Sequence, residues 1–513
     1  MPISKLKQAA LLSYLGITIS IISGIIYTPW MIKTIGTSDY AIFSLAMSII
    51  GFFSIDFGLG PAVAKFLLDY KNNQDKKGYR QFLTTIYRIF WCVSIIASIA
   101  FCIFYFIMED IFIELTSEEL DKLKVVYLIA ACFALLSMVY RPLDGVLVAN
   151  ERFVFIKSLE VIKKIVTLIA IISLLLLDYG LYSLVFANAL VGAFKILAQF
   201  IYVRRYSLDA SPFDTANINV VRKVFIFSTW IMVVTVAQRF IVLIAPMLLA
   251  ALSGSNAVAI FSVAMVIEAY SYMLSSAISG LFLPRVSKTL AQDNGSREHL
   301  LSLLIKVGRL QLIIFGLVVS GFILLGQEFI HLWVGSDFRE VYFVTLLLII
   351  HGVVTFPQEI AKTTLFASGD IKYYAYSVMV VAFFSLLCSF FFIPMFGAIG
   401  AALSIAIGQF IGNIVLINYF YIVVLKIDMK SFFVQCHIKI IPAILATLLL
   451  EFAFYHAVIP TTWIFFFAKV LIVGITYTLS LWLLSLNNFE KQLFRQLFAL
   501  IHPIKKRKAN VLE

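Results

Sequence analysis

Residues 40–66, YAIFSLAMSIIGFFSIDFGLGPAVAKF, decide the fold, because this apolar run is long enough to cross a lipid bilayer. Its first eight residues, YAIFSLAM, return almost unchanged as VAIFSVAM at 258–265. The two copies lie 218 residues apart, which is about two fifths of the chain. A membrane-spanning segment repeated at this distance predicts a membrane protein built from two related halves.

The composition indicates that most of the chain lies in a membrane. Of the 513 residues, 62% are hydrophobic and 13% are charged, and the mean hydropathy is +1.00. A soluble domain carries about 25% charged residues, so this chain lacks the polar residues to cover a water-exposed surface. The segments between the apolar stretches are too short for a soluble catalytic domain. We predict 14 spans, at about 11–32, 40–66, 84–108, 125–148, 159–177, 181–202, 224–250, 257–284, 301–325, 341–367, 375–393, 398–425, 439–456 and 463–485.

The basic residues between these spans predict the orientation of the chain. Alternate segments carry 24 and 4 Lys and Arg residues, and the richer side is expected to face the cytoplasm. Both termini are therefore predicted to be cytoplasmic, and the net charge of +12 is first a topological signal and not evidence of nucleic-acid binding. The poorer side holds only Lys33, Lys122, Lys124 and Arg339.

Two further matches support the internal repeat. LVAN (147–150) corresponds to LFAS (365–368) at an offset of 218, and DYGLYSL (178–184) corresponds to MFGAIGA (395–401) at 217. Because the repeat unit contains six helices, both copies have the same orientation, as in transporters whose substrate path runs between the halves. We predict an all-α integral membrane protein of about 14 transmembrane helices, with two parallel six-helix lobes around a central cavity. The expected parts are lobes 1–205 and 219–425, helices 13 and 14 at 426–485, and a basic cytoplasmic tail at 486–513.

Other local signals exclude several classes of protein. The start, MPISKLKQAALLSYLGITIS, lacks a small-residue cleavage site, so we expect the first membrane helix there and not a removed signal peptide. The five cysteines form no CxxC pair, which predicts neither a disulfide framework nor a metal site. The motifs GxxxxGK[ST], HExxH and GxSxG are absent from the sequence, so we expect no enzyme and no cofactor.

Ionisable residues deep in the spans carry the functional signal, because a charge in lipid is costly and usually faces a cavity or a partner. Arg239 lies about 22 Å along its helix, and Glu268 lies at a similar depth in the next one. These two residues either form an ion pair that orients two helices or face a cavity. Lys163, Lys164 and Lys469 lie near span ends and are expected to extend toward the interface. The deep set is Asp56, Lys195, Arg239, Glu268, Glu359 and Lys362.

The second span contains residues that can interrupt a helix. Pro61 removes a backbone hydrogen bond, and Gly58 and Gly60 permit close approach of a neighbour. Broken helices occur at transporter binding sites, but glycine and proline are also common in ordinary membrane helices, so both interpretations remain open. Asp56 needs a partner in lipid, and a cation, a proton or Lys65 would serve.

Several basic residues gather near the predicted inner ends of helices. If they meet at a vestibule between the lobes, they form an electropositive funnel for an anionic headgroup. Each one taken singly is also explained by the ordinary excess of positive charge on the cytoplasmic side. The group comprises Lys65, Arg88, Arg141, Arg285, Lys288 and Lys362.

Residues 14–66 resemble the O-antigen and capsule repeat-unit flippases, the polysaccharide-transporter branch of the multidrug/oligosaccharidyl-lipid/polysaccharide exporter superfamily. The shared pattern is a first helix, a short turn to a Gly-x-x-x-Tyr motif at 36–40, and an Asp-x-Gly-Leu motif at 56–59. ASGDIKYY (367–374) resembles the inner end of their tenth helix. The general pattern extends over about residues 5–485.

The resemblance implies a flippase of the bacterial inner membrane. It would move an undecaprenyl-pyrophosphate-linked oligosaccharide from the inner to the outer leaflet by alternating access, coupled to Na⁺ or H⁺, and would supply a polysaccharide polymerase and chain-length machinery. The resemblance also implies a cationic cavity and an ion-coupling site. The candidates are Arg239, Lys65, Arg141, Arg285 and Lys195 for the headgroup, and Asp56 and Glu268 for coupling.

Two other functions remain open at this point. A multidrug or cation antiporter of the same superfamily would need a net acidic cavity, whereas the deep charges here are three basic and three acidic residues. A membrane-embedded polymerase or glycosyltransferase acting on the same lipid usually carries an extended outer loop. The longest outer segment expected here, 109–124, is short.

Overall fold

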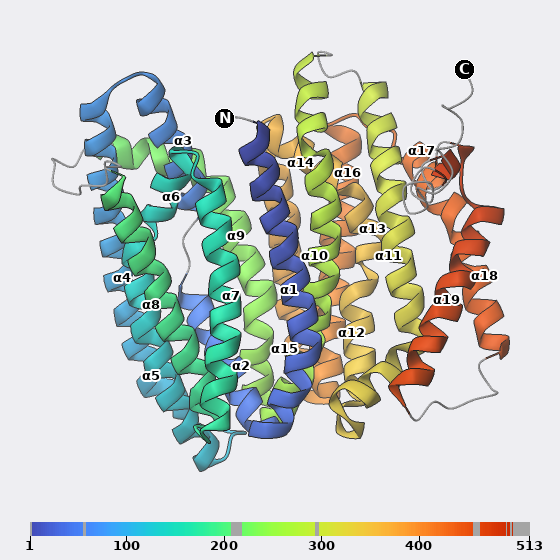
Figure 1. Cartoon of the computed structure of the whole chain (residues 1–513), viewed down its shortest axis with the longest axis horizontal. Coiled ribbons are helices and arrows are strands. Elements are labelled where there is room, and N and C mark those ends of the chain that lie inside the picture. Colours follow the sequence, from blue (N-terminus) through green and yellow to red (C-terminus); the bar gives the residue numbers. More distant parts are fainter. Residues whose placement is uncertain are drawn as a thin grey trace, which may run out of the picture. The chain divides into compact units, whose positions relative to one another are not determined.

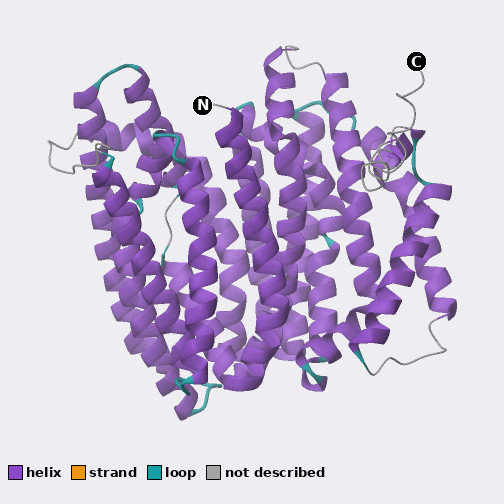
Figure 2. Ribbon diagram, viewed as in Figure 1, coloured by secondary structure: helices purple, strands orange, loops and turns teal. Residues whose placement is uncertain are grey.

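The computed structural model is helical almost throughout, with short connecting loops (Figure 2). It describes residues 3–54, 58–206, 218–292, 297–454, 462–488, 490–492 and 495. In this part of the chain, eleven helices are long and apolar enough to cross a membrane. The protein is therefore an all-α, multi-pass membrane protein, as the composition predicted.

The first six predicted spans correspond to eight helices, because two of the spans are interrupted. The second span, predicted as one helix over 40–66, ends at Phe53 and resumes at Leu59. The fourth bends at Arg141–Pro142, where proline has no backbone N–H to continue the ladder. The helices are α1 (Ile3–Ile35), α2 (Thr37–Phe53), α3 (Leu59–Asn72), α4 (Lys76–Ile111), α5 (Ser117–Tyr140), α6 (Pro142–Ala149), α7 (Phe153–Leu176) and α8 (Leu181–Arg205).

The remainder of the described chain contains the other predicted spans. Ile371–Val423 is a continuous helical stretch of 53 residues that bends at Gly397, so it supplies two spans. With this division, and with the short α2 and the lysine-bearing α7 included, the count agrees with about fourteen. The elements are α9 (Ile218–Leu252), α10 (Gly254–Gln292), α11 (Arg297–Val334), η1 (Ser336–Phe338), α12 (Glu340–Ile350), α13 (Gly352–Thr355), η2 (Phe356–Gln358), α14 (Glu359–Ala367), α15 (Ile371–Gln409), η3 (Phe410–Leu416), α16 (Ile417–Val423), α17 (Met429–Phe433), η4 (Val434–Ile438), α18 (Lys439–Phe454) and α19 (Trp463–Leu484).

The backbone repeats its unusual turns at the offset seen in the sequence. A positive φ is uncommon and favours glycine, yet it occurs at three pairs of matching positions. Two pairs lie 218 residues apart and the third 217, so the repeat extends from the amino-acid pattern to the turn geometry. The pairs are Gly36 (φ 88°) with Gly254 (79°), Glu151 (56°) with Gly369 (84°), and Gly180 (53°) with Gly397 (52°).

The chain forms two compact units by its internal contacts. The first unit comprises Met1–Ala277, Trp333–His351 and Leu365–Phe420. The second comprises Ile278–Leu332, Gly352–Thr364 and Tyr421–Glu513. The first unit thus contains all of α1 to α9, and α10 and α11 contribute residues to both.

Inside the first unit, helices approach one another closely where small residues face a neighbour. A Cβ added to Gly145 of α6 would lie 2.4 Å from Val63 Cγ1 of α3. Small residues of this kind allow membrane helices to gain contact by close packing, since lipid offers no hydrophobic drive between helices. The buried cluster around this contact includes Leu59, Leu67 and Phe82.

A proline in α1 frees a backbone carbonyl that another helix then satisfies. Pro29 has no N–H to donate to the carbonyl of Ile25, four residues earlier. The indole Nε1–H of Trp333, at the end of α11, donates to that oxygen at 2.7 Å. In lipid no water can take this role, so the Trp333 indole ties α11 to α1 within the first unit.

In the second unit, a buried ion pair holds the segment after α19 against α11. Arg309 is 3% exposed and donates from Nε and Nη2 to the two carboxylate oxygens of Glu490, at 2.5 and 2.7 Å. Nη1 donates to the carbonyl of Gln435 at 2.6 Å, and Nη2 also donates to the carbonyl of Ser485 at 2.8 Å. Four of the five guanidinium N–H groups are therefore bonded, and the buried charge has its counter-charge.

We expect Glu490→Gln to lower the free energy of unfolding by about 3–5 kcal/mol, because the change leaves the buried Arg309 charge uncompensated. The measurement is chemical unfolding in detergent micelles. Glu109→Gln is the matched control, since Glu109 pairs with Lys124 and its side chain is 61% exposed. Exposed pairs contribute about 0.2–1 kcal/mol. Equal losses in the two variants would contradict this role for Glu490.

Candidate functional site

The break between α2 and α3 is built on a glycine that packs against α9. Gly58 precedes α3 with φ 64°, and a Cβ added there would lie 2.7 Å from Ile231 Cγ2 of α9. Gly60 and Pro61 lie in the first turn of α3, where backbone N–H groups have no partner within the helix. Proline is therefore accommodated without loss of a hydrogen bond. Asp56 lies outside the described residues.

Two guanidinium groups meet the C-terminal end of α2. Arg141 Nη2 donates to the carbonyl of Ser54 at 3.1 Å. Arg239 of α9 lies beside the last turn, since a Cβ added to Gly51 would be 3.8 Å from its Nη1. The rings of Phe52 and Phe240, 5.0 Å apart and edge to face, form part of the same contact. A helix C-terminus carries partial negative charge, which favours both cations.

Arg239 has no acidic partner in the part of the chain that the structure describes. It is half-buried and lies in the middle of the span Ser228–Leu252. The ion pair with Glu268 that the sequence left open is not formed among the described side chains. Glu268 of α10 is also half-buried, and no described cation lies within 4 Å of it. Charges in such positions face a cavity or a ligand.

The other predicted headgroup residues are placed as follows. Lys65 lies on an exposed face of α3. Lys195 of α8 is half-buried and close enough to Lys163 of α7 for electrostatic repulsion. Arg285 belongs to α10, but its side chain lies outside the described part. Of the predicted set, the structure thus brings Arg141, Arg239 and Gly58 together around the break.

Lys164 makes a contact with α1 that the sequence analysis did not predict. Its Nζ donates to Ser20 Oγ at 2.6 Å and to the carbonyl of Gly16 at 3.1 Å. Because α7 begins at Phe153, Lys164 lies about 16 Å along this helix. Lys469 pairs with Glu328 at 2.9 Å.

A signal for the Lys164 contact is present in α1. Ser13, Gly16, Ser20, Ser23 and Tyr27 follow one another at intervals of three and four residues. Such a stripe lies on one face of a helix, and small or hydroxyl-bearing residues favour contact with another membrane helix. The stripe predicts that α1 has a partner, but it does not identify α7.

A polar network joins the ends of helices on the side that the sequence assigns to the exterior. Lys122 pairs with Asp39 at 2.9 Å and with Glu118 at 3.0 Å. Ser38 donates to Glu119 at 2.5 Å, and Glu119 also bonds Ser255 at the start of α10. The network therefore links residues of both sequence repeats within the first unit. It lines a polar hollow of about 430 Å³.

The same fold is found in solved membrane transporters. The lipid II flippase MurJ in an inward closed conformation superposes with a TM-score of 0.69 at 16% identity, over 95% of this chain and 100% of that chain. A multidrug resistance MATE family transporter of the MOP superfamily, in an inward-facing conformation, gives 0.63 at 12% identity, over 82% and 95%. At these identities the likeness concerns the fold.

Residues 6–290 match the family model described as polysaccharide biosynthesis protein, and the chain belongs to this family. The resemblance drawn from the sequence is thereby confirmed at the level of the family. A capsular polysaccharide biosynthesis protein, CapF of Staphylococcus aureus, is 26% identical over 174 residues. That alignment covers 33% of this chain and 42% of CapF, so the chain matches less than half of that relative's length.

We expect Gly58→Ala to destabilise the protein by more than about 1–2 kcal/mol, the cost of the left-handed conformation alone, because the new Cβ also meets Ile231. Gly60→Ala is the matched control, since an added Cβ there has no heavy atom within 4 Å. Alanine in a helix is favoured over glycine by up to about 1 kcal/mol. Thermal unfolding in detergent distinguishes the variants, and equal stability would rule out a need for glycine at the break.

Proposed function

We propose that the protein is a flippase that moves an undecaprenyl-pyrophosphate-linked oligosaccharide repeat unit from the inner to the outer leaflet of the bacterial cytoplasmic membrane. The observation that carries this proposal is Arg239, a half-buried guanidinium at mid-span with no described acidic partner. A guanidinium forms paired hydrogen bonds with phosphate oxygens. An anionic headgroup passing this depth would supply the partner that Arg239 lacks.

The surroundings of Arg239 suit a headgroup that must bind and then leave. Arg141 donates to the carbonyl of Ser54 and so holds the end of α2 in place, beside the interruption between α2 and α3. Broken helices of this kind line substrate sites in transporters. Lys65, Lys195 and Arg285 complete the proposed cationic path, and Asp56 and Glu268 are the proposed sites of Na⁺ or H⁺ coupling.

The relatives support the chemical class of the substrate. The name of MurJ assigns it lipid II as the transported lipid, and the name of CapF assigns it capsular polysaccharide biosynthesis. The membership in the polysaccharide biosynthesis family agrees with a glycan carried on a lipid. In this proposal both termini are cytoplasmic, and the exported unit becomes the substrate of a polysaccharide polymerase and its chain-length machinery.

A second candidate function, a multidrug or cation antiporter, rests on a different observation. Glu268 is half-buried with no described cation within 4 Å, and a cationic drug or a coupling ion would neutralise it. The fold is shared with MATE transporters. The cations around α2 argue against a cationic substrate, because they would repel it.

We expect deletion of the gene to abolish the surface polysaccharide and to trap single lipid-linked repeat units in the inner leaflet. The measurement combines surface-glycan staining with analysis of lipid-linked sugars accessible in intact cells and in inverted vesicles. Repeat units that reach the outer leaflet but stay unpolymerised would contradict the proposal and favour a polymerase.

We expect Arg239→Ala to reduce export of the repeat unit at least tenfold, because a charge-assisted bond to phosphate worth about 1.5–3 kcal/mol is lost. Arg204→Ala is the control. Arg204 lies in the last turn of α8, away from the break, and its guanidinium lies over the Phe200 ring. Both proteins should insert in the membrane at wild-type levels. Wild-type export by Arg239→Ala would remove Arg239 from the site.

A further inference from the structure

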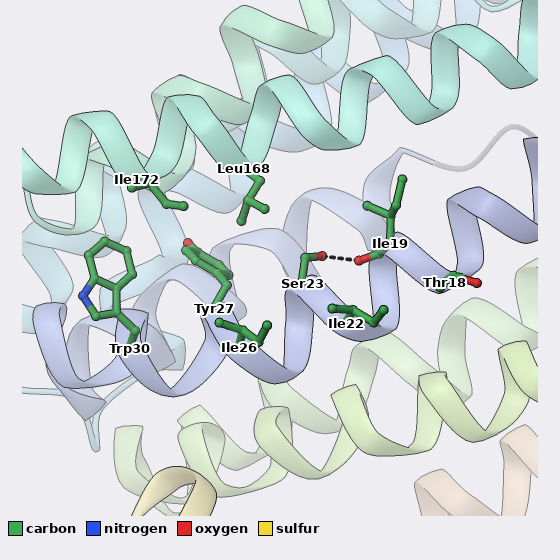
Figure 3. A pocket seen from close by; sticks show the side chains of 9 residues that line it. All are labelled: Thr18, Ile19, Ile22, Ser23, Ile26, Tyr27, Trp30, Leu168 and Ile172. Atoms are coloured by element: carbon green, nitrogen blue, oxygen red, sulfur yellow. Dashed lines mark hydrogen bonds between the residues drawn. The ribbon is translucent and has the colours of Figure 1, made fainter.

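A long apolar groove runs between α1 and α7, outside the contacts used for the proposed headgroup site (Figure 3). Its volume is about 510 Å³. Two isoleucines of α1 that line it are strongly exposed, Ile22 at 54% and Ile26 at 69%. From α1 the groove is lined by Thr18, Ile19, Ile22, Ser23, Ile26, Tyr27 and Trp30, and from α7 by Leu168 and Ile172.

One end of the groove is marked by a cation. Lys164, Leu168 and Ile172 are spaced by four residues and so lie on one face of α7. Lys164 is exposed, and its ammonium bonds Ser20 and Gly16 of α1, next to the first groove residues. An ammonium has three donors, so two bonds to α1 leave one for a phosphate oxygen. The aromatic pair Tyr27 and Trp30, 6.2 Å apart, marks the other end.

We infer that this groove binds the polyprenyl chain of the lipid-linked substrate, with the first phosphate of the headgroup at Lys164. The inference rests on the proposed function, which supplies a polyprenyl carrier. It adds a second element to the substrate site, a place for the lipid chain that is distinct from the cations at the α2–α3 break.

The length of the groove favours a polyprenyl chain over the acyl chain of an ordinary phospholipid. The hydrocarbon core of a bilayer is about 30 Å thick, so the chains of one leaflet fill about 15 Å of it. Along α1 the groove begins at Thr18, about 26 Å from the end of the helix at Ile35, and finishes at Trp30, about 8 Å from that end. It therefore continues past the middle of the span, farther than an acyl chain of one leaflet reaches and within the reach of a polyprenyl chain.

The groove is also long enough to guide a chain. From Thr18 to Trp30 it follows α1 over about 18 Å. Its walls are the apolar side chains of two helices that pack along each other, as Figure 1 shows for α1 and α7. A polyprenyl chain in this groove would stay in an apolar environment while its headgroup occupies a polar path. The chain would not have to enter the polar path, and the headgroup would not have to enter the groove.

The first test measures binding of undecaprenyl phosphate to the full-length protein in nanodiscs of phosphatidylethanolamine and phosphatidylglycerol, by native mass spectrometry. Leu168→Trp fills the groove and should weaken binding about tenfold or more, since it displaces two or more buried methylene groups. Ile169→Trp is the matched control, because Ile169 is 57% exposed on the same helix but does not line the groove. Equal binding by the two variants would overturn the inference.

The second test distinguishes binding of the phosphate from binding of the polyprenyl chain. Lys164→Ala should weaken binding of undecaprenyl phosphate about tenfold, as expected for one charge-assisted hydrogen bond, and leave binding of undecaprenol unchanged. Lys164→Arg should retain most of the phosphate binding. If Lys164 only held α1 against α7, both lipids would lose affinity together. Competition by phosphatidylglycerol at equal potency would also overturn the inference, because it would identify a general lipid site.

The experiments distinguish an error in the assignment of the groove from an error in the proposed function. If deletion of the gene leaves the surface polysaccharide intact while Leu168→Trp still abolishes undecaprenyl phosphate binding, the flippase proposal fails and the groove stands as a polyprenyl-lipid site. If deletion abolishes the polysaccharide while Leu168→Trp binds and exports normally, the groove assignment fails and the flippase proposal stands.

Discussion

Every backbone N–H and C=O group that lies inside the bilayer must find its hydrogen-bond partner within the protein, and this constraint governs the interrupted helices of the structure. Where Pro29 removes a donor from α1, the Trp333 indole supplies one to Ile25. Where the second span is interrupted, Arg141 donates to the carbonyl of Ser54. Lipid cannot hydrogen-bond the backbone groups at such an interruption, and Arg141 satisfies one of them.

Two arginines differ in the partners that the described part of the protein offers them. Arg309 is buried with both oxygens of Glu490 and two backbone carbonyls, so all of its charge is matched within the second unit. Arg239 lies at mid-span beside the end of α2, and the described residues provide no carboxylate for it. A buried charge needs a partner, and this difference between Arg309 and Arg239 is the reason that we propose Arg239 for the headgroup.

Lys164 extends this logic to an amphiphilic ligand. Its ammonium is bonded to Gly16 and Ser20 of α1 and adjoins an apolar groove lined by side chains of both helices. A lipid-linked glycan has the matching order of parts, an apolar chain joined to phosphate. The polar network of Asp39, Lys122, Glu119 and Ser255 joins both repeats at the start of α2. The other end of α2, at the break, is instead contacted by Arg141 and Arg239.

The amino-acid sequence alone determined the membrane class, about fourteen spans, the repeat and the family, because composition and apolar length are local properties of the chain. The repeat reappears in the backbone at Gly36 and Gly254, where glycine adopts a positive φ without steric cost. The tertiary structure decided which groups meet: Arg239 lies beside the end of α2 and forms no ion pair with Glu268 among the described side chains, and Lys164 contacts Ser20 of α1. The rotation of each helix and the choice of its neighbour depend on packing over the whole surface of the helix, which no short stretch of sequence contains.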